Sequence, residues 1–237
     1  MRSLQVMPIM LSVLLGSPAG TNRPGPGVAG VQPRSDTGVA SVRRIAGGAP
    51  QEPVAAAPAQ RIGGRKSRIV IEEYSDFECP YCAAHENQYG AAMDEWVGRQ
   101  KGKVRLDFYD VALRQHHFAA AAARAARCAG AQGRYSAARH ALFAARDEWA
   151  RAADAPGRVA ALARGTVRDS ARFERCLATD TAAVNAVLAA NLQRGRDLGI
   201  PGTPTFVISV AGKRAQVVDP VAPDSLQQVI RSLESDR

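Results

Sequence analysis

Two cysteines, Cys79 and Cys82, stand two residues apart in the stretch YSDFECPYCAAHENQ, which begins at Tyr74. Three kinds of chemistry use such a pair: half of a zinc site, a structural crosslink, or a disulfide that forms and breaks during turnover. Pro80 favours the first turn of a helix, which would place Cys79 at a helix N-terminus. The unpaired amides and the helix dipole at that end stabilise a thiolate, the reactive form of cysteine.

The two cysteines are predicted to differ in exposure and in role. Cys82 lies one turn further on, on the apolar side of the predicted helix, so Cys79 would meet a substrate and Cys82 would resolve the mixed disulfide. A zinc site needs two more ligands, and the remaining cysteines and the four histidines show no paired ligand spacing, so no metal is expected. A crosslink across two residues would restrain the unfolded chain little. The redox pair is the favoured interpretation.

Glu73 is a candidate proton partner for this pair. It belongs to a strand predicted in RKSRIVIEEYSDF, where β-branched residues dominate. Extended geometry places Glu73 on the same face as Ile69 and Ile71, which predicts burial. A buried carboxyl group has a raised pKa and can exchange a proton with Cys82. The alternative is that Glu73 faces solvent at a sheet edge.

The elements that must position these residues follow an α/β order. A second strand is predicted in KVRLDFYDVAL, and the segment from about 115 to 198 is helical throughout. PGTPTFVISVAGKRAQVV predicts two strands around a turn at Ala211 and Gly212, and a closing helix follows. The strand–helix–strand start implies a parallel crossover, and the final hairpin adds antiparallel pairs. The sequence therefore predicts a mixed central sheet with a helical insertion between its two halves.

The first 64 residues differ in composition from the rest of the chain. Residues 1–20 carry one Arg, a short apolar run and then small residues, which predicts a signal peptide or an N-terminal anchor. Residues 21–64 are rich in Pro, Gly and Ala without a period, which predicts a disordered tether before a domain at 65–237. We therefore expect an extracytoplasmic protein, in the periplasm or cell envelope.

Composition also limits the partners. The net charge of +9 comes without a run of basic residues interleaved with aromatic ones, so we expect no nucleic acid to bind. The predicted tether offers no dimerisation domain, and we expect a monomer.

With IVIEEYSDFECPYCAAHE at one end and LGIPGTPTFVIS at the other, residues 65–237 resemble the DsbA-like branch of the thioredoxin superfamily. The resemblance implies a thioredoxin fold with inserted helices. We expect no cofactor. It implies that Cys79 is the attacking cysteine, Cys82 the resolving one and Glu73 the buried acid.

The resemblance also implies a substrate-binding edge beside the sulfurs. The Thr203–Pro204 bond is expected to be cis and to present the backbone of Thr203 to an extended substrate. Pro80 and Tyr81, between the two cysteines, are expected to contact the same substrate.

Cys128 and Cys176 form a second candidate pair, in the inserted helices. Some exported relatives bridge two such cysteines, and an even cysteine count in an exported chain supports a structural disulfide. A closed loop of about 48 residues would stabilise the fold by several kcal/mol in the chain-entropy model. The alternative is two buried free thiols. His116 and His117 are placed near the rim of the site, where a solvated helix start is the favoured interpretation.

Three functions fit these observations. The first is an exported thiol–disulfide oxidoreductase that introduces disulfides into folding proteins, and the resemblance implies that a membrane quinone-linked thiol oxidase reoxidises it. The second reverses the direction, as a reductase or isomerase, because Tyr81 lacks the cationic donor that a histidine would supply between the cysteines. The third is a non-enzymatic peptide-binding chaperone whose cysteines are structural.

Overall fold

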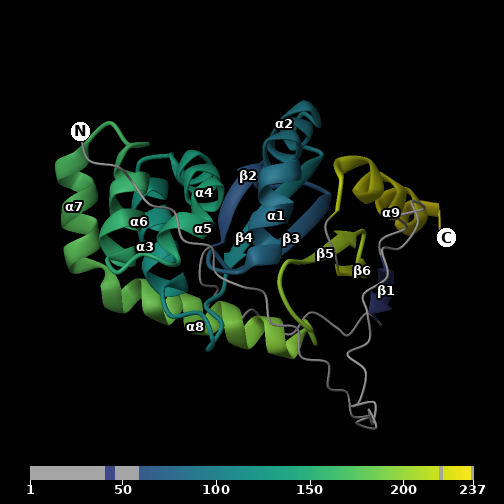
Figure 1. The fold of residues 1–237 in the computed structure, drawn as a ribbon. Coiled ribbons are helices and arrows are strands. Elements are labelled where there is room, and N and C mark those ends of the chain that lie inside the picture. The colour runs from purple at the N-terminus through teal and green to yellow at the C-terminus, as the bar shows by residue number, and fades with distance from the viewer. Residues whose placement is uncertain (1–40, 46–58, 219–220, 236–237) are drawn as a thin grey trace, which may run out of the picture. The chain divides into compact units, whose positions relative to one another are not determined.

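The structure is a computed structural model that describes residues 41–45, 59–218 and 221–235 (Figure 1). The predicted signal peptide or anchor, residues 1–20, lies outside the described residues. The elements, in chain order, are β1 (Ser41–Ile45), β2 (Gln60–Gly63), β3 (Ile69–Ser75), α1 (Pro80–His85), the π-helical segment η1 (Glu86–Gly90), α2 (Ala91–Arg99), β4 (Val104–Asp110), α3 (Ala119–Gly130), α4 (Tyr135–Ala144), α5 (Arg146–Trp149), α6 (Ala155–Arg164), α7 (Ser170–Thr179), α8 (Thr181–Asp197), β5 (Thr205–Val210), β6 (Lys213–Val218) and α9 (Pro223–Ser235).

Six strands form one mixed sheet in the order β1-β6-β5-β3-β4-β2. Strands β3 and β4 are parallel and are connected through α1, η1 and α2, while β5 runs antiparallel to both β3 and β6. Helices α3 to α8 are inserted between β4 and β5 (Figure 1). The predicted mixed sheet, crossover and helical insertion are therefore confirmed.

The two faces of the central strands pack against different hydrophobic clusters. Ile71 on β3 and Leu106 on β4 belong to the main core, which also takes in Trp96 of α2. The opposite face forms a smaller cluster around Tyr74 and Val207, against which α8 and the segment after it pack. Alternation along β3 therefore places Glu73 in the main core and its neighbour Glu72 on the α8 side.

The sheet extends into the stretch predicted as a tether. β2 pairs antiparallel with β4, and Arg61 Nε lies 2.6 Å from Asp107 Oδ1. β1 pairs antiparallel with β6 at the other edge. A four-residue edge strand with Ile62 as its single large apolar residue shows no hydrophobic period, so the sequence pattern did not reveal it. The ordered domain thus begins before residue 65, while residues 21–40 and 46–58 lie outside the described residues.

The helix that follows Cys79 is interrupted by the π-helical segment η1. A π turn contains an extra residue, which rotates the helix face that follows it. Glu86 and Gly90 are buried on this segment, and Ala92, just after it, is exposed. A Cβ atom at Gly90 would overlap the carboxylate of Glu86, so glycine at this position lets Glu86 turn inward.

A disulfide joins Cys128 in α3 to Cys176 in α7, with an S–S distance of 1.97 Å and a sequence separation of 48. It ties two helices of the insertion together, as the sequence led us to expect. In the part of the chain that the structure describes, no helix is both long and apolar enough to cross a membrane.

Candidate active site

Cys79 and Cys82 lie where strand β3 leads into helix α1. Cys79 is the N-cap residue of α1, and Pro80 occupies its first turn, as predicted from the sequence. Both cysteines are free thiols, with Cys79 5% exposed and Cys82 1% exposed. The pair is therefore asymmetric, with the more accessible sulfur at the open end of the helix.

The two thiols differ strongly in proton affinity. A hydrogen bond from Cys82 is the largest influence on Cys79, and it lowers the pKa of the Cys79 thiol to about 5 against the opposing effect of burial. The side chain of Thr203 and the backbone amides of Cys82 and Tyr81 lower it further. Burial raises the pKa of Cys82 well above its usual range. In the reduced pair, therefore, Cys79 is the thiolate and Cys82 keeps its proton.

The second motif reaches the same place from the far end of the chain. The Thr203–Pro204 bond is cis, as predicted. Cys79 Sγ lies 3.5 Å from the carbonyl oxygen of Thr203, to which it donates a hydrogen bond when it is protonated. Thr205, the next residue but one, pairs with Tyr74 across the β3–β5 ladder, and this pairing positions the loop beside the sulfurs.

The surface beside the sulfurs carries an aromatic ring. Tyr81 is 71% exposed, and no other large hydrophobic side chain stands exposed among the described residues. Pro80 is exposed next to it. These positions fit the predicted contact with substrate, which stays a prediction.

Asp76 is a site residue that the sequence reasoning missed. Its side chain is fully buried and accepts hydrogen bonds from the backbone amides of Glu78 and Leu113, both at 2.8 Å. His116 Nδ1 lies 2.9 Å from the second oxygen of Asp76, and the amide of Asp76 donates to Cys82 Sγ at 3.5 Å. His116 is therefore not simply solvated, as the sequence had suggested. A carboxylate directly after a strand, three residues before Cys79, was the available signal.

Glu73 is buried, as predicted, with 2% of its surface exposed. Burial raises the pKa of Glu73 to about 8, the carboxylates of Glu86 and Asp94 add to the rise, and the guanidinium of Arg139 opposes it. Glu73 is therefore mostly a neutral acid at neutral pH. Its predicted exchange of a proton with a cysteine stays a prediction.

One group near Glu73 also acts on the resolving cysteine. The Ser75 side chain lowers the pKa of both Glu73 and Cys82. Its Oγ atom makes no hydrogen bond to a described residue. Ser75 is thus a buried hydroxyl that acts on the pKa of both the acid and the resolving thiol.

A buried ionic network adjoins Glu73. Arg139 of α4 donates to Glu86 Oε1 and to Asp94 Oδ1, both at 2.8 Å, and its guanidinium lies 3.9 Å from the centre of the Phe108 ring. His140 Nδ1 lies 2.5 Å from the same oxygen of Glu86. No sequence signal marks Arg139, because an arginine in an alanine-rich helix is usually a solvated surface residue.

Comparison with known proteins gives two curated relatives. The Na(+)/H(+) antiporter NhaA 1 of Salinispora arenicola is 33% identical over 148 residues, 62% of this chain and 21% of that protein. The Na(+)/H(+) antiporter NhaA 3 of Salinispora tropica is 30% identical over 147 residues, again 62% of this chain and 21% of that protein. The chain thus spans about a fifth of the length of these relatives.

Solved structures with the same fold come from several bacteria. A thioredoxin-like oxidoreductase from Silicibacter pomeroyi matches with a TM-score of 0.58 and 26% identity, covering 76% of this chain and 94% of the other. Pseudomonas aeruginosa DsbA2 matches with a TM-score of 0.53 and 26% identity, covering 76% and 96%. Wolbachia pipientis alpha-DsbA1 has a TM-score of 0.59 at 22% identity, covering 74% and 90%, which shows the shared fold.

The family model described as thioredoxin matches residues 56–232, well over half of the chain. This match also begins before residue 65, in agreement with the position of β2 in the sheet. By these comparisons the chain belongs to the thioredoxin superfamily and is similar to its DsbA-like members.

Proposed function

We propose that the protein is an exported oxidase that introduces disulfides into folding extracytoplasmic proteins. In the first step a substrate thiolate attacks Cys79 Sγ of the oxidised pair, and the electron pair of the broken S–S bond leaves on Cys82 Sγ, which takes up a proton. In the second step another substrate thiolate attacks the substrate sulfur of the mixed disulfide and expels the Cys79 thiolate. The substrate dithiol is oxidised, and the cysteine pair is reduced.

The observation that carries the direction of exchange is the stabilised thiolate of Cys79. A thiolate whose pKa is about 5 is a good leaving group at neutral pH, which favours release of the oxidised substrate. It also stabilises the reduced pair, and a stable reduced form makes the oxidised pair a stronger oxidant. The Cys82 thiol, the Thr203 side chain and two backbone amides supply this stabilisation without a histidine between the cysteines.

Export and partners are part of the proposal. The Cys128–Cys176 disulfide supports an oxidising compartment, because such bonds are rare in the reducing cytosol. The partners that we propose are cysteine-containing folding proteins and a membrane quinone-linked thiol oxidase that restores the Cys79–Cys82 disulfide. We propose that the protein acts as a monomer.

Cysteine variants test the proposed exchange. The oxidised protein should accelerate oxidative refolding of a reduced model protein, and Cys79→Ser should abolish this acceleration. Cys82→Ser, mixed with a disulfide-bonded substrate, should instead accumulate mixed disulfides, because the Cys79 thiolate attacks the substrate disulfide, a substrate thiolate leaves, and no resolving thiol is present. Full activity in Cys79→Ser would favour the chaperone alternative. Efficient reduction of insulin without oxidative refolding would favour the reductase alternative.

A further inference from the structure

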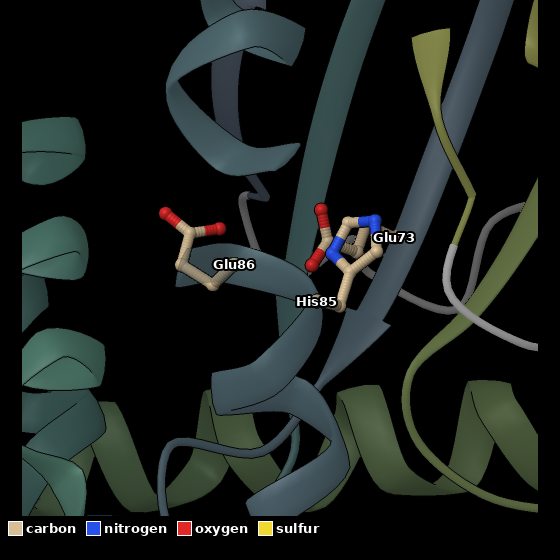
Figure 2. Close-up of side chains that lie close together, drawn as sticks. All are labelled: Glu73, His85 and Glu86. Atoms are coloured by element: carbon tan, nitrogen blue, oxygen red, sulfur yellow. The ribbon is translucent and has the colours of Figure 1, made fainter. Parts of the chain in front are cut away.

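A carboxyl group and an imidazole lie together beneath the active-site helix. Glu73 on β3, His85 at the end of α1 and Glu86 at the start of η1 offer atoms that all lie within 4.8 Å of one another. Each of the three is buried, and His85 is 1% exposed. Figure 2 shows the Glu73 carboxyl group beside the His85 imidazole, with Glu86 on the adjoining turn. The exchange reaction described above gives His85 no role.

The hydrogen bonds of His85 define which of its nitrogens carries the proton. Nε2 lies 3.3 Å from the carbonyl oxygen of Val221, and a carbonyl oxygen can only accept, so Nε2 carries the hydrogen. Burial lowers the pKa of His85, so the ring is neutral and Nδ1 is an acceptor. Nδ1 is buried without a hydrogen-bond partner among the described residues. In Figure 2 it is the ring nitrogen on the Glu73 side.

Glu73 has the complementary requirement. Its carboxyl group is neutral below pH 8 and therefore carries a hydrogen that needs an acceptor inside the core. The charged groups of the surrounding helices are Glu86 of η1, Asp94 of α2, and Arg139 and His140 of α4, and these pair with one another. A protonated acid thus adjoins an imidazole whose Nδ1 has no donor among the described residues.

A metal ion is a poorer occupant of this cluster. Arg139 Nε lies 2.8 Å and His140 Nδ1 lies 2.5 Å from Glu86 Oε1, so cationic or hydrogen-donating groups already hold that oxygen. A metal ion at the same place would face the buried guanidinium of Arg139 across the shared carboxylate, and like charges repel strongly in a buried site.

We propose that His85 is a positioning residue for the acid–base group of the exchange reaction, and that its Nδ1 accepts a hydrogen bond from the neutral Glu73 carboxyl group. The hydrogen bond is inferred from the proximity of the two groups and from the unpartnered Nδ1, while its purpose rests on the proposed exchange function. A hydrogen bond made to the neutral acid disfavours its ionised form, so His85 helps to keep Glu73 protonated.

Glu73 and His85 act at the step in which Cys82 gains or loses its proton. When the S–S bond opens, Glu73 gives its proton to the Cys82 thiolate, and the resulting carboxylate later recovers a proton from solvent. In reoxidation the direction reverses: Glu73 as a carboxylate takes the proton from Cys82, which then attacks as a thiolate. His85 orients the acid for both transfers and is itself neither charged nor consumed.

Nitrogen NMR of the reduced, histidine-labelled protein tests the hydrogen bond directly, and His85→Phe identifies the resonances of His85. We expect the Nε2–H tautomer, with a resonance of Nδ1 shifted by a hydrogen bond. Glu73→Ala should move that resonance to the position of a free acceptor, and Glu73→Gln, which keeps an N–H donor, should largely restore it. The Nδ1 resonance of the wild-type protein should also lose this shift as pH rises through about 8, because Glu73 then loses its proton. This titration tests the hydrogen bond even if Glu73→Ala fails to fold.

A kinetic measurement tests whether His85 positions Glu73 for the exchange reaction. His85→Phe keeps the aromatic contacts with Phe206 and Tyr89, at 4.9 and 5.6 Å between ring centres, but has no acceptor. We expect its exchange rate at pH 7 to fall about twofold, because a loss of about one unit from the Glu73 pKa would reduce the protonated fraction of this acid from about nine-tenths to about one-half, and we expect the inflection of its rate–pH profile to move to lower pH.

Two results would overturn the proposal: an Nδ1–H tautomer of His85, or an Nδ1 resonance that Glu73→Ala leaves unchanged. An unaltered rate–pH profile in His85→Phe would remove the positioning role while leaving the hydrogen bond in place. The NMR measurement needs no substrate, so its outcome is independent of whether the protein works as an oxidase.

Discussion

At the scale of single residues, the site separates two tasks between two chemically identical side chains. Cys79 holds the negative charge because donors converge on it, and Cys82 holds the proton because it is buried. Neither pKa is intrinsic to cysteine. Each results from the surroundings of the residue, and the two residues lie one helical turn apart. The same logic applies to Glu73, whose burial among other acids turns an ordinary carboxylate into a proton donor near neutral pH.

The hydroxyl of Thr203 should contribute measurably to the low pKa of Cys79. It has no hydrogen-bond partner among the described residues while Cys79 is a thiol, and it can donate to the thiolate. Because a hydrogen bond to a charged group is worth about 1.5–3 kcal/mol, Thr203→Val should raise the Cys79 pKa by roughly one to two units. Ultraviolet thiolate absorbance against pH measures this shift. Thr203→Ser, which keeps the hydroxyl, is the control, and equal pKa values in all three proteins would refute the contribution.

Burial of Glu73 should make stability depend on pH. Its pKa rises from 4.5 to about 8 on folding, so between these values the folded state holds a proton that the unfolded chain has released. The free energy of unfolding should therefore fall as pH rises through this window. Denaturant titrations of the oxidised protein, in which Cys79 and Cys82 do not titrate, measure the fall. Glu73→Gln should lose this component, and identical slopes in both proteins would argue against a buried neutral acid.

The sequence was informative for residues whose spacing carries chemistry, and uninformative for those that act only through tertiary contacts. Cys79, Cys82 and Pro204 belong to short motifs, and strand alternation placed Glu73 in the core. His85 and Arg139 become relevant only once the sheet, the active-site helix and the insertion are packed together. Nothing in the local pattern distinguishes Arg139 from the other arginines of the insertion.

At the scale of elements, the π-helical segment η1 connects the redox helix to the buried charges. Its extra residue turns Glu86 inward toward Arg139, and Gly90 leaves the room that the carboxylate needs. The sequence predicted a helix that begins at Pro80, but no local pattern in it indicates the π turn that causes this rotation. Strand β2 was missed for a related reason, since its stability comes from pairing with β4 rather than from its own pattern.

Gly90 at the end of η1 and Gly98 in α2 provide a matched comparison. Gly90→Ala should lower the free energy of unfolding by about 1–3 kcal/mol, because the new methyl group overlaps the Glu86 carboxylate in a packed core. Gly98→Ala, at a position of α2 with open space around it, should instead raise stability by about 0.5–1 kcal/mol. Urea denaturation measures both changes. Stabilisation by both substitutions would show that Glu86 does not occupy the space above Gly90.

At the scale of the whole molecule, three distant parts of the chain meet at one end of the sheet. Strand β3 delivers the cysteines, the loop before β5 delivers the cis proline, and the insertion delivers Arg139 to the acids below. The sequence predicted the first two through recognisable motifs and the insertion through its helical composition. The Cys128–Cys176 disulfide ties α3 to α7 within that insertion.

The reduction potential of the Cys79–Cys82 pair tests the central claim most directly. The thiolate of Cys79 should stabilise the reduced protein, so equilibration with glutathione buffers should give a potential clearly more positive than about −270 mV, the value typical of thioredoxin. The reduced protein should accordingly be more stable to denaturant than the oxidised one. A potential at or below about −270 mV, with an oxidised form as stable as the reduced form, would contradict the proposed oxidase.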